Sequence, residues 1–514
     1  MKSALKIFNN KKKFGILIAI LVLIILLSGL FTDLRFSDEI YHFWFAKDWY
    51  IAGERPVYNE LLHTVPEYGY YRYYLSVPLW HYELKSIFNL SGNISKNLAQ
   101  VYMAVWYILL IFGTYLLAKT VYDEQLGLYS AFVVATMPFI VSFSILFFID
   151  VPIAAVTPYL IYFVIKRRYI LAGIIMGLMF LLKENSYSLF PASCLLLLVN
   201  SHKSRPIKLT KRFLQVMLFS VLVLFVTLPN FKFRLDNFHG LLFPHDEGAI
   251  FVSIHDMLKH EVQKPEVPKP EVTKPVEVNY LTSSLTSFPT FFKYFGLLFP
   301  PLLLWRIISI LKYKDFHKME VFLVIYILIY IPLYLIAFQG WWEIRYLSPI
   351  IPLLCIFSVK GIRRLKPWIH SIIVFVGLIM FFSTTVFLYL ERQITSSEKG
   401  IIELIKKLPD GRILSPEPFI SFYTGRPTIW TDSFKYTPGM SLYEIFWDDS
   451  DIKKERIFKD FKIKYIHIPC ERIYDDMKVR HFGGYPKSFV ERLPKLSFVK
   501  LVFDNKDMSI WQVE

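Results

Sequence analysis

The sequence is poor in charge, in cysteine and in recognisable catalytic loops. Charged residues make up 19% of its 514 residues, whereas soluble proteins contain about 25%. The three cysteines, Cys194, Cys355 and Cys470, lie far apart and give neither a disulfide framework nor a metal-ligand spacing. The C-terminal part has no phosphate-binding loop and no nucleophile elbow. These absences exclude a disulfide-stapled scaffold and leave the apolar residues as the main signal.

Apolar and basic residues are abundant. The chain is 54% hydrophobic and 18% aromatic, and its formal net charge is +16. The lysines and arginines cluster in short loops between long apolar runs, which is the positive-inside pattern of membrane proteins and not a nucleic-acid-binding face. The composition therefore indicates a polytopic membrane protein with a soluble part, and nucleic acid is not an expected partner.

About eleven apolar runs approach the roughly 20 residues that a membrane-spanning helix needs. The first run has no small-residue cleavage site at its end and continues into Asp33 and Arg35, so we interpret it as a retained helix and not as a signal peptide. The predicted spans lie near residues 14–31, 100–118, 126–147, 151–165, 169–182, 186–200, 213–230, 292–311, 319–338, 346–359 and 368–390.

The basic loops predict the orientation of these spans. Lys11, Lys12 and Lys13 precede the first span and indicate a cytoplasmic N-terminus. Alternation then puts the strongly basic loops at 166–168, 203–212, 312–318 and 360–366 on the same inner side. An odd number of spans puts the tail outside the cell membrane.

We predict a mainly α fold with two domains. Residues 1–390 form a transmembrane helical bundle with outer loops at 32–99 and 231–291, and residues 391–514 form a small extracytoplasmic α/β domain. In this tail the pattern predicts a helix at 452–461, strands at 411–414 and 464–469, and a hairpin of 497–503 with 508–513. A Pro-Glu-Val repeat at 264–278 is interpreted as an extended spacer.

Polar outliers gather on the predicted outer side. Asp38 and Glu39 follow the first span, Asp150 lies between two apolar runs, Lys183 and Glu184 end another, and Arg345 follows two tryptophans. Charges near the bilayer are costly and often functional. Each also has a plain structural interpretation. Asp150 suits a helix N-cap, Lys183 can reach the interface with its long side chain, and the acidic pair can be a polar helix end.

The first outer loop is crowded with aromatic side chains. Its segment 68–84, YGYYRYYLSVPLWHYEL, mixes tyrosines with Arg72, His81 and Glu83. It could be an amphipathic helix in the headgroup plane. It could also provide stacking faces for a sugar ring, and the two interpretations are compatible.

These features resemble the GT-C membrane glycosyltransferases. The resemblance rests on an acidic pair after the first span, FFIDVPI around Asp150, GLMFLLKEN ending at Asn185, and RYLSPIIPLL starting at Arg345. It is nearest to the branch of protein O-mannosyltransferases and aminoarabinose transferases. The tail stretches LSPEPFISFYTGRP and FKDFKIKYIHIP are similar to the outer domain of prokaryotic members.

The resemblance implies transfer of a sugar from a polyprenyl-phosphate donor to a hydroxyl of a glycan, lipid or protein at the outer face. By that resemblance Asp38 is the base, with Glu39 beside it, and Asp150 orients the acceptor or assists the base. Lys183 and Arg345 would hold the phosphate, because ammonium and guanidinium groups stabilise a departing anion. The candidate substrate-binding set is completed by Glu184, His42 and Arg72.

Two other functions compete with this one. A transporter or flippase of a lipid-linked sugar would place its polar site at the bilayer midplane between repeats, whereas the outliers here lie at helix ends and no internal repeat is visible. A membrane scaffold presenting the tail would not explain their common sidedness. No cofactor is required by the pattern; carboxylates can bind a divalent cation, but no ligand spacing demands one.

Overall fold

The computed structural model describes residues 10–35, 37–56, 78–199, 209–238, 295–337, 344–431, 445–446, 450–474 and 484–514. The chain forms two compact units, which are treated separately below. The first unit comprises Met1–Phe31, Leu75–Trp80 and Ser95–Glu391, and the second comprises Thr32–Tyr74, His81–Ile94 and Arg392–Glu514. The Pro-Glu-Val repeat lies outside the described residues.

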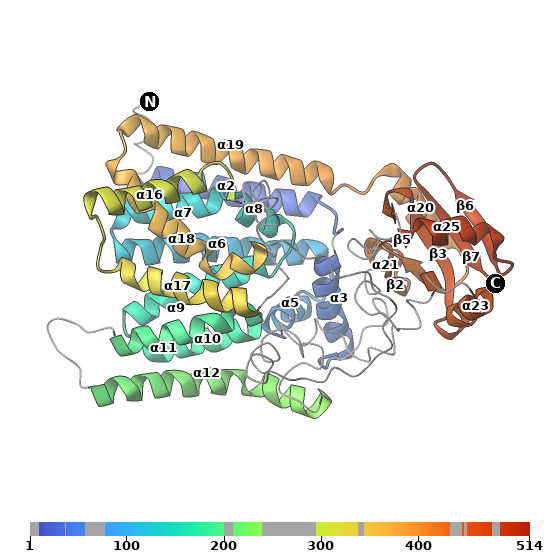
Figure 1. Ribbon diagram of the computed structural model, residues 1–514, viewed down its shortest axis with the longest axis horizontal. Coiled ribbons are helices and arrows are strands. Elements are labelled where there is room, and N and C mark those ends of the chain that lie inside the picture. Colours follow the sequence, from blue (N-terminus) through green and yellow to red (C-terminus); the bar gives the residue numbers. More distant parts are fainter. Residues whose placement is uncertain are drawn as a thin grey trace, which may run out of the picture. The chain divides into compact units, whose positions relative to one another are not determined.

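The first unit is a bundle of helices, many of which run alongside one another (Figure 1). Each of the eleven predicted spans coincides with a helix or with two consecutive helical segments. The elements are α2 (Lys11–Phe31), α6 (Lys96–Val121), α7 (Glu124–Thr136), α8 (Pro138–Ile145), α9 (Asp150–Ile165), α10 (Tyr169–Leu182), η2 (Glu184–Ser188), α11 (Leu189–Val199), α12 (Leu209–Phe238), α16 (Phe299–Tyr313), α17 (Glu320–Ala337), η4 (Ile344–Ile350), α18 (Ile351–Val359), η5 (Lys360–Arg364) and α19 (Pro367–Glu391).

Five helical stretches in the described part of the chain are long and apolar enough to cross a membrane. They are α2, α6, most of α12, the stretch Arg345–Arg364 and α19, and the bent pair α7–α8 would make a sixth. Large apolar side chains such as Phe213, Met217 and Phe225 on α12 are exposed, as expected where lipid covers the surface. The chain is thus a multi-pass membrane protein, and a total of eleven crossings stays a prediction.

Small residues lie where α10 packs against α12. A Cβ added to Gly173 would lie 2.9 Å from the carbonyl oxygen of Phe219. One added to Gly177 would lie 2.6 Å from the Cβ of Val226. Two glycines four residues apart therefore let the helices approach more closely than any larger side chain would permit.

A buried charge cluster ties the ends of α16, α17 and η5 together. One guanidinium nitrogen of Arg306, Nη2, lies 2.5 and 2.7 Å from the two carboxylate oxygens of Glu320. Tyr122 donates to Glu320 over 2.6 Å. Lys360 Nζ lies 3.0 Å from Asp315 Oδ1. Part of the basic sequence predicted to face the cytoplasm is thus engaged in ion pairs that hold helix ends in place.

The second unit combines helices with a small sheet. Its elements are α3 (Ser37–Ala52), most of α5 (Pro78–Ser91), α20 (Ser396–Lys407), β1 (Arg412–Ser415), α21 (Phe419–Thr424), β2 (Thr428–Trp430), α23 (Asp451–Asp460), β3 (Ile463–Pro469), η7 (Cys470–Arg472), β4 (Ile473–Tyr474), β5 (Tyr485–Pro486), α25 (Lys487–Arg492), η8 (Leu493–Lys495), β6 (Val499–Asp504) and β7 (Met508–Val513).

The five-stranded sheet has the order β2-β1-β3-β7-β6. Strands β2, β1 and β3 are parallel, and β3, β7 and β6 are antiparallel. The predicted helix, strands and hairpin of the tail are present, with ends displaced by one or two residues. Because this unit also includes Thr32–Tyr74 and His81–Ile94, an independent domain at 391–514 stays a prediction.

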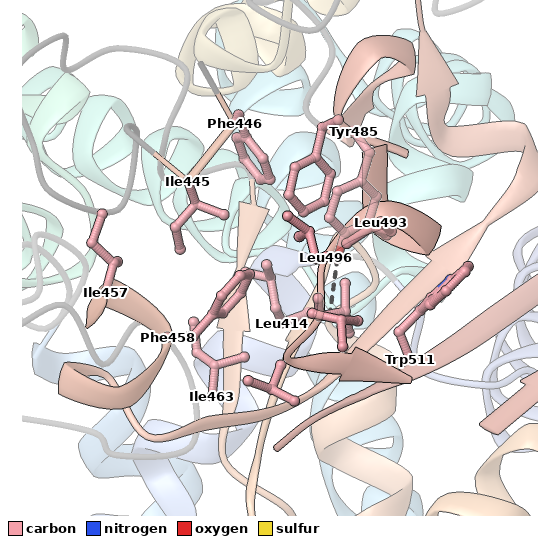
Figure 2. Packing of buried hydrophobic residues seen from close by; sticks show 14 of the residues in the cluster. Leu414, Ile445, Phe446, Ile457, Phe458, Ile463, Tyr485, Leu493, Leu496 and Trp511 are labelled. Atoms are coloured by element: carbon pink, nitrogen blue, oxygen red, sulfur yellow. Dashed lines mark hydrogen bonds between the residues drawn. The ribbon is translucent and has the colours of Figure 1, made fainter. Parts of the chain in front are cut away.

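The core of the sheet is apolar and closely packed (Figure 2). Leu414 of β1 and Trp511 of β7 lie in one cluster with Phe458 of α23 and Phe446. Tyr485 brings a hydroxyl into this core and donates it to the carbonyl oxygen of Leu414 over 2.9 Å. The one polar atom that this tyrosine buries is thereby satisfied.

Candidate functional site

Asp150 is the first residue of α9, and its side chain has no exposed surface. The chain turns into this helix at Phe147, whose φ is 52°. Lys183 Nζ lies 2.6 Å from Asp150 Oδ1, and the hydroxyl of Ser348 donates to the same oxygen over 3.3 Å. The N-cap position belongs to Ile149 and no side-chain cap bond forms. Asp150 therefore forms an ion pair with Lys183 and does not cap the helix.

Tyr346 joins the basic residues of this cluster. The Lys183 ammonium lies 5.0 Å from the centre of the Tyr346 ring. The Arg345 guanidinium lies 5.5 Å from that centre and 5.9 Å from the centre of the Phe148 ring. Three polar positions that the sequence placed on one side of the membrane are thus brought together from α9, from the residue after α10, and from η4.

The backbone of η4 is held by side chains of neighbouring elements. The carbonyl oxygen of Tyr346 accepts from Asn185 Nδ2 over 3.1 Å and from the hydroxyl of Tyr330. Neither Tyr346, Ser348 nor Tyr330 was among the predicted site residues. Hydroxyl side chains are common in apolar segments, and only their position beside Asp150 distinguishes them here.

The second carboxylate oxygen of Asp150 has an unused acceptor capacity. Among the described residues Oδ2 has no hydrogen-bond partner, although it is buried. An ionised carboxylate accepts about four hydrogen bonds, and a buried polar atom without a partner is costly. The Asp150–Lys183 pair is therefore arranged so that one carboxylate oxygen can accept a further hydroxyl.

Glu39 is engaged in an ion pair within the second unit. Arg392 Nη1 donates to Glu39 Oε1 over 2.6 Å, and Arg392 Nη2 donates to Oε2. The backbone N–H of Arg35 donates to the same Oε2 over 3.2 Å. Both oxygens are therefore occupied. Asp38 lies in the first turn of α3, but its side chain lies outside the described residues.

The turn before α3 is attached to the start of the tail. Asp33 accepts from the backbone N–H of Ile394 over 3.0 Å and from the hydroxyl of Tyr423 over 3.2 Å. Arg35 Nη2 lies 2.5 Å from Glu398 Oε1. Glu398 also completes a capping box with Thr395 at the start of α20. These contacts join the residues before α3 to the start of the tail.

His42 is paired with a second histidine. Its Nδ1 lies 2.8 Å from His81 Nε2, and both rings are buried. The Phe45 ring lies 4.2 Å away from that of His81. Burial, the neighbouring His42 and Arg55 lower the pKa of His81 well below its usual range. The pair is therefore neutral on the His81 side, and a substrate-binding role for His42 stays a prediction.

Three predicted site residues cannot be placed. Arg72 and the side chains of Asp38 and Glu184 lie outside the described residues, as do the tryptophans that precede Arg345. In the part of the chain that is described, no three His, Cys, Asp or Glu side chains gather as a metal site would require.

One segment of the chain matches a known protein family. Residues 76–231, which include Asp150 and Lys183, match the family model for dolichyl-phosphate-mannose-protein mannosyltransferase. No curated protein matches the chain by sequence.

Solved structures are similar over nearly the whole chain. ArnT from Cupriavidus metallidurans bound to undecaprenyl phosphate has a TM-score of 0.62 at 14% identity, covering 98% of both chains. The apo oligosaccharyltransferase of Archaeoglobus fulgidus has a TM-score of 0.57 at 14% identity, covering 99% of this chain and 75% of that one. The arabinofuranosyltransferase AftD from Mycobacteria has 0.51 at 13% identity, covering 96% and 39%.

The chain has the fold of the GT-C glycosyltransferases, and the resemblance predicted from its sequence is confirmed. Residues 76–231 match the mannosyltransferase family model, and the fold of the chain is similar to that of ArnT. At 13–14% identity the solved structures establish the fold alone. The activity has to be argued from the site.

Proposed function

We propose that this chain is an integral-membrane glycosyltransferase that moves a sugar from a polyprenyl-phosphate donor to a hydroxyl acceptor at the outer membrane face. The observation that carries the proposal is the buried Asp150–Lys183 pair, with Asp150 Oδ2 unpartnered among the described residues and Arg345 near the same tyrosine ring. The donor class is supported by the ArnT structure with undecaprenyl phosphate and by the mannosyltransferase family model.

The reaction is a displacement at the anomeric carbon of the sugar. The acceptor hydroxyl oxygen forms the new bond to this carbon, and the bond from the carbon to the phosphate oxygen breaks. Its electron pair stays on the leaving polyprenyl phosphate, and the hydroxyl proton passes to a carboxylate. Inversion at the anomeric carbon follows from a single displacement. Because phosphate is a good leaving group, the protein needs a base and cations and no covalent intermediate.

We assign the base to Asp38 and the orientation of the acceptor to Asp150. Asp38 stands at the start of α3 beside Glu39, whose own carboxylate is occupied by Arg392. Asp150 Oδ2 is suited to accept the acceptor hydroxyl. Lys183 and Arg345 supply the positive charge for the phosphate, which Arg binds as a two-pronged fork and Lys as a point charge. Glu184, His42 and Arg72 remain in the proposed substrate-binding set.

The proposal includes the topology and domain boundaries predicted from the sequence. The basic residues before α2 put the N-terminus in the cytoplasm, and eleven spans then put residues 391–514 outside. A domain there is suited to present the acceptor. A glycan, a lipid or a protein hydroxyl is compatible with the chemistry.

A transfer assay with polyprenyl-phosphate sugar tests the assignment of the base. Asp38→Asn keeps the size of the side chain and removes the proton acceptor, so turnover should fall by about 10²–10⁴-fold. Binding of the donor and the yield of folded protein should change little. Glu39→Gln should cost less, because Glu39 is engaged with Arg392 and acts as an anchor.

Two results would contradict the assignment. Near-normal turnover by Asp38→Asn together with an inactive Glu39→Gln would exchange the two roles. Full activity of both variants would make the acidic pair a structural helix end. Absence of transfer from every polyprenyl-phosphate sugar by the unmodified protein, measured with a range of hydroxyl acceptors, would refute the donor class.

A further inference from the structure

A buried ion pair in the second unit joins α3 to the start of the tail. Glu39 is completely buried and Arg392 is 1% exposed, although 353 residues separate them. The guanidinium of Arg392 contacts both Glu39 and Asp33. Nη1 and Nη2 hold the two oxygens of Glu39, while Nε and Nη2 donate to the carbonyl oxygen of Asp33 over 3.2 and 2.6 Å.

This arrangement holds the chain on both sides of the α3 N-terminus. Asp33 lies before the helix, and Glu39 is its third residue. A planar guanidinium that grips both fixes the direction in which the helix starts. The N–H of Arg35 adds a third contact to Glu39. In the sequence Asp38 lies between Asp33 and Glu39, the two residues that Arg392 contacts.

Stability alone does not account for such a pair. The cost of taking two charges out of water can exceed their mutual attraction, so a buried ion pair is weak evidence for stabilisation. A displacement of a catalytic group by about 1 Å can cost about 10²-fold in rate. A pair with this geometry is therefore better suited to fix the position of its neighbour than to stabilise the unit.

We infer that Arg392, acting through Glu39, is a positioning residue for the base Asp38. The inference rests on the proposed function, because it assumes that Asp38 takes the acceptor proton. Arg392, at the start of the tail, then belongs to the catalytic arrangement although it makes no contact with the substrate. The two acids then have different roles: Glu39 anchors the helix, and Asp38 takes the proton of the acceptor hydroxyl.

The experiment uses the full-length protein and compares Arg392→Lys with Asp38→Asn and with the double variant. Lysine keeps the charge opposite Glu39 but cannot grip two targets with a planar fork. We expect Arg392→Lys to lower kcat about 10-fold or more, with KM for the polyprenyl-phosphate sugar within about 2-fold. In the Asp38→Asn background the same change should cause no further loss, because its effect passes through Asp38.

A neighbouring pair provides the matched control. Arg35 and Glu398 also form an ion pair, at 2.5 Å, with side chains 22% and 10% exposed. This pair does not involve a side chain of α3. Arg35→Lys should therefore leave kcat within about 2-fold of the unmodified protein. If Arg392→Lys fails to fold, Glu39→Gln/Arg392→Gln removes both charges together and is expected to fold with the same loss of kcat.

Three outcomes separate this inference from the proposed function. Unchanged kcat in both Arg392→Lys and the double glutamine variant would make the pair purely structural. Losses that multiply in the Asp38→Asn background would show that Arg392 does not act through Asp38. Near-normal turnover by Asp38→Asn would instead refute the base assignment, and it would do so irrespective of any Arg392 variant.

Discussion

At the scale of single residues, the two buried acids Glu39 and Asp150 have different environments. Glu39 has both carboxylate oxygens occupied by Arg392 and by a backbone N–H. Asp150 has one oxygen paired with Lys183 and another without a hydrogen-bond partner in the described part of the chain. A carboxylate with all its lone pairs occupied is an anchor, and one with spare capacity can accept a substrate hydroxyl. Both acids are buried, so the occupied oxygens of the carboxylate distinguish Glu39 from Asp150, and burial does not.

The Asp150–Lys183 pair leads to a stability prediction. Lys183→Met leaves a buried carboxylate without its cation, which typically costs about 3–5 kcal/mol. The melting temperature of the purified protein in detergent should fall clearly. In Asp150→Asn/Lys183→Met both charges are absent, so most of the loss should be recovered. Transfer activity should stay low in both variants.

Lys119 provides the comparison for that measurement. Its pair with Glu124 spans 3.9 Å, and its side chain is 45% exposed. Exposed pairs contribute about 0–1 kcal/mol, so Lys119→Met should hardly change the melting temperature. An equally small effect of Lys183→Met would mean that the Asp150 carboxylate does not depend on Lys183 for its charge.

At the scale of elements, glycines decide how α10 meets α12. Gly177→Leu introduces a side chain where even a Cβ would lie 2.6 Å from Val226. Forcing the helices apart should destabilise the protein by about 1–3 kcal/mol. The melting temperature in detergent measures the effect. Gly15→Leu is the control, since no atom lies within 4 Å of the corresponding Cβ position on α2. Equal effects of the two variants would argue against the close α10–α12 contact.

The sheet contains a pH-sensitive group in β3. His467 is 1% exposed, and its Nδ1 lies 2.9 Å from the Ser415 hydroxyl. Burial lowers the pKa of His467 to about 3, whereas an unfolded histidine has a pKa of about 6.5. Between these values the unfolded state binds more protons. Stability is therefore complete above about pH 6.5 and falls as the pH drops, by about 1.4 kcal/mol per pH unit.

Hydrogen exchange of the β3 amides tests this dependence. Lowering the pH from 7 to 5 should reduce the opening free energy of β3 by about 2 kcal/mol, after correction for the intrinsic exchange rate. His467→Gln retains a polar partner for Ser415 and removes the titrating group, so this part of the pH dependence should vanish. The same slope in the variant would assign the acid sensitivity to other groups.

At the scale of the whole molecule, a native cysteine reports the orientation. Cys470 is exposed and belongs to the tail, whereas Cys355 is buried and Cys194 is half-buried. A membrane-impermeant maleimide should label Cys470 in intact cells if the tail is outside. Burial raises the pKa of the Cys470 thiol, so labelling is best done near pH 8. Cys470→Ser should abolish the signal.

The result decides between two orientations. Labelling that occurs only after the membrane has been permeabilised would put the tail in the cytoplasm. The outer-face site and the use of an outward-facing donor would then both be wrong. An engineered cysteine near Lys12 should show the opposite behaviour, because the basic residues before α2 predict a cytoplasmic N-terminus.

Much of the fold was predictable because its signals are local. An apolar run of about 20 residues specifies a membrane helix whatever surrounds it, and every predicted span coincides with helical structure. The hairpin at the end of the tail followed from alternating residues around Asn505. Strand ends moved by one or two residues because the last ladder bonds depend on the partner strand.

The candidate site was predictable only as a set of positions. Asp150, Lys183 and Arg345 stood out because charge is rare and costly beside long apolar runs. Tyr346 and Ser348 did not stand out, because tyrosine and serine occur throughout the chain. Their part in the cluster depends on η4 lying against the start of α9, a contact between residues almost 200 positions apart.

The sequence by itself determined the class of molecule: a multi-pass helical protein with polar outliers and a resemblance to the GT-C glycosyltransferases. Hydrophobic length and charge act locally, so they can be recognised without knowing the fold. Only the tertiary structure decided which partner each charged group has. In the structure Glu39 pairs with Arg392, and Asp150 pairs with Lys183. An ion pair depends on distances of a few ångströms between segments, and the order of residues along the chain does not determine these distances.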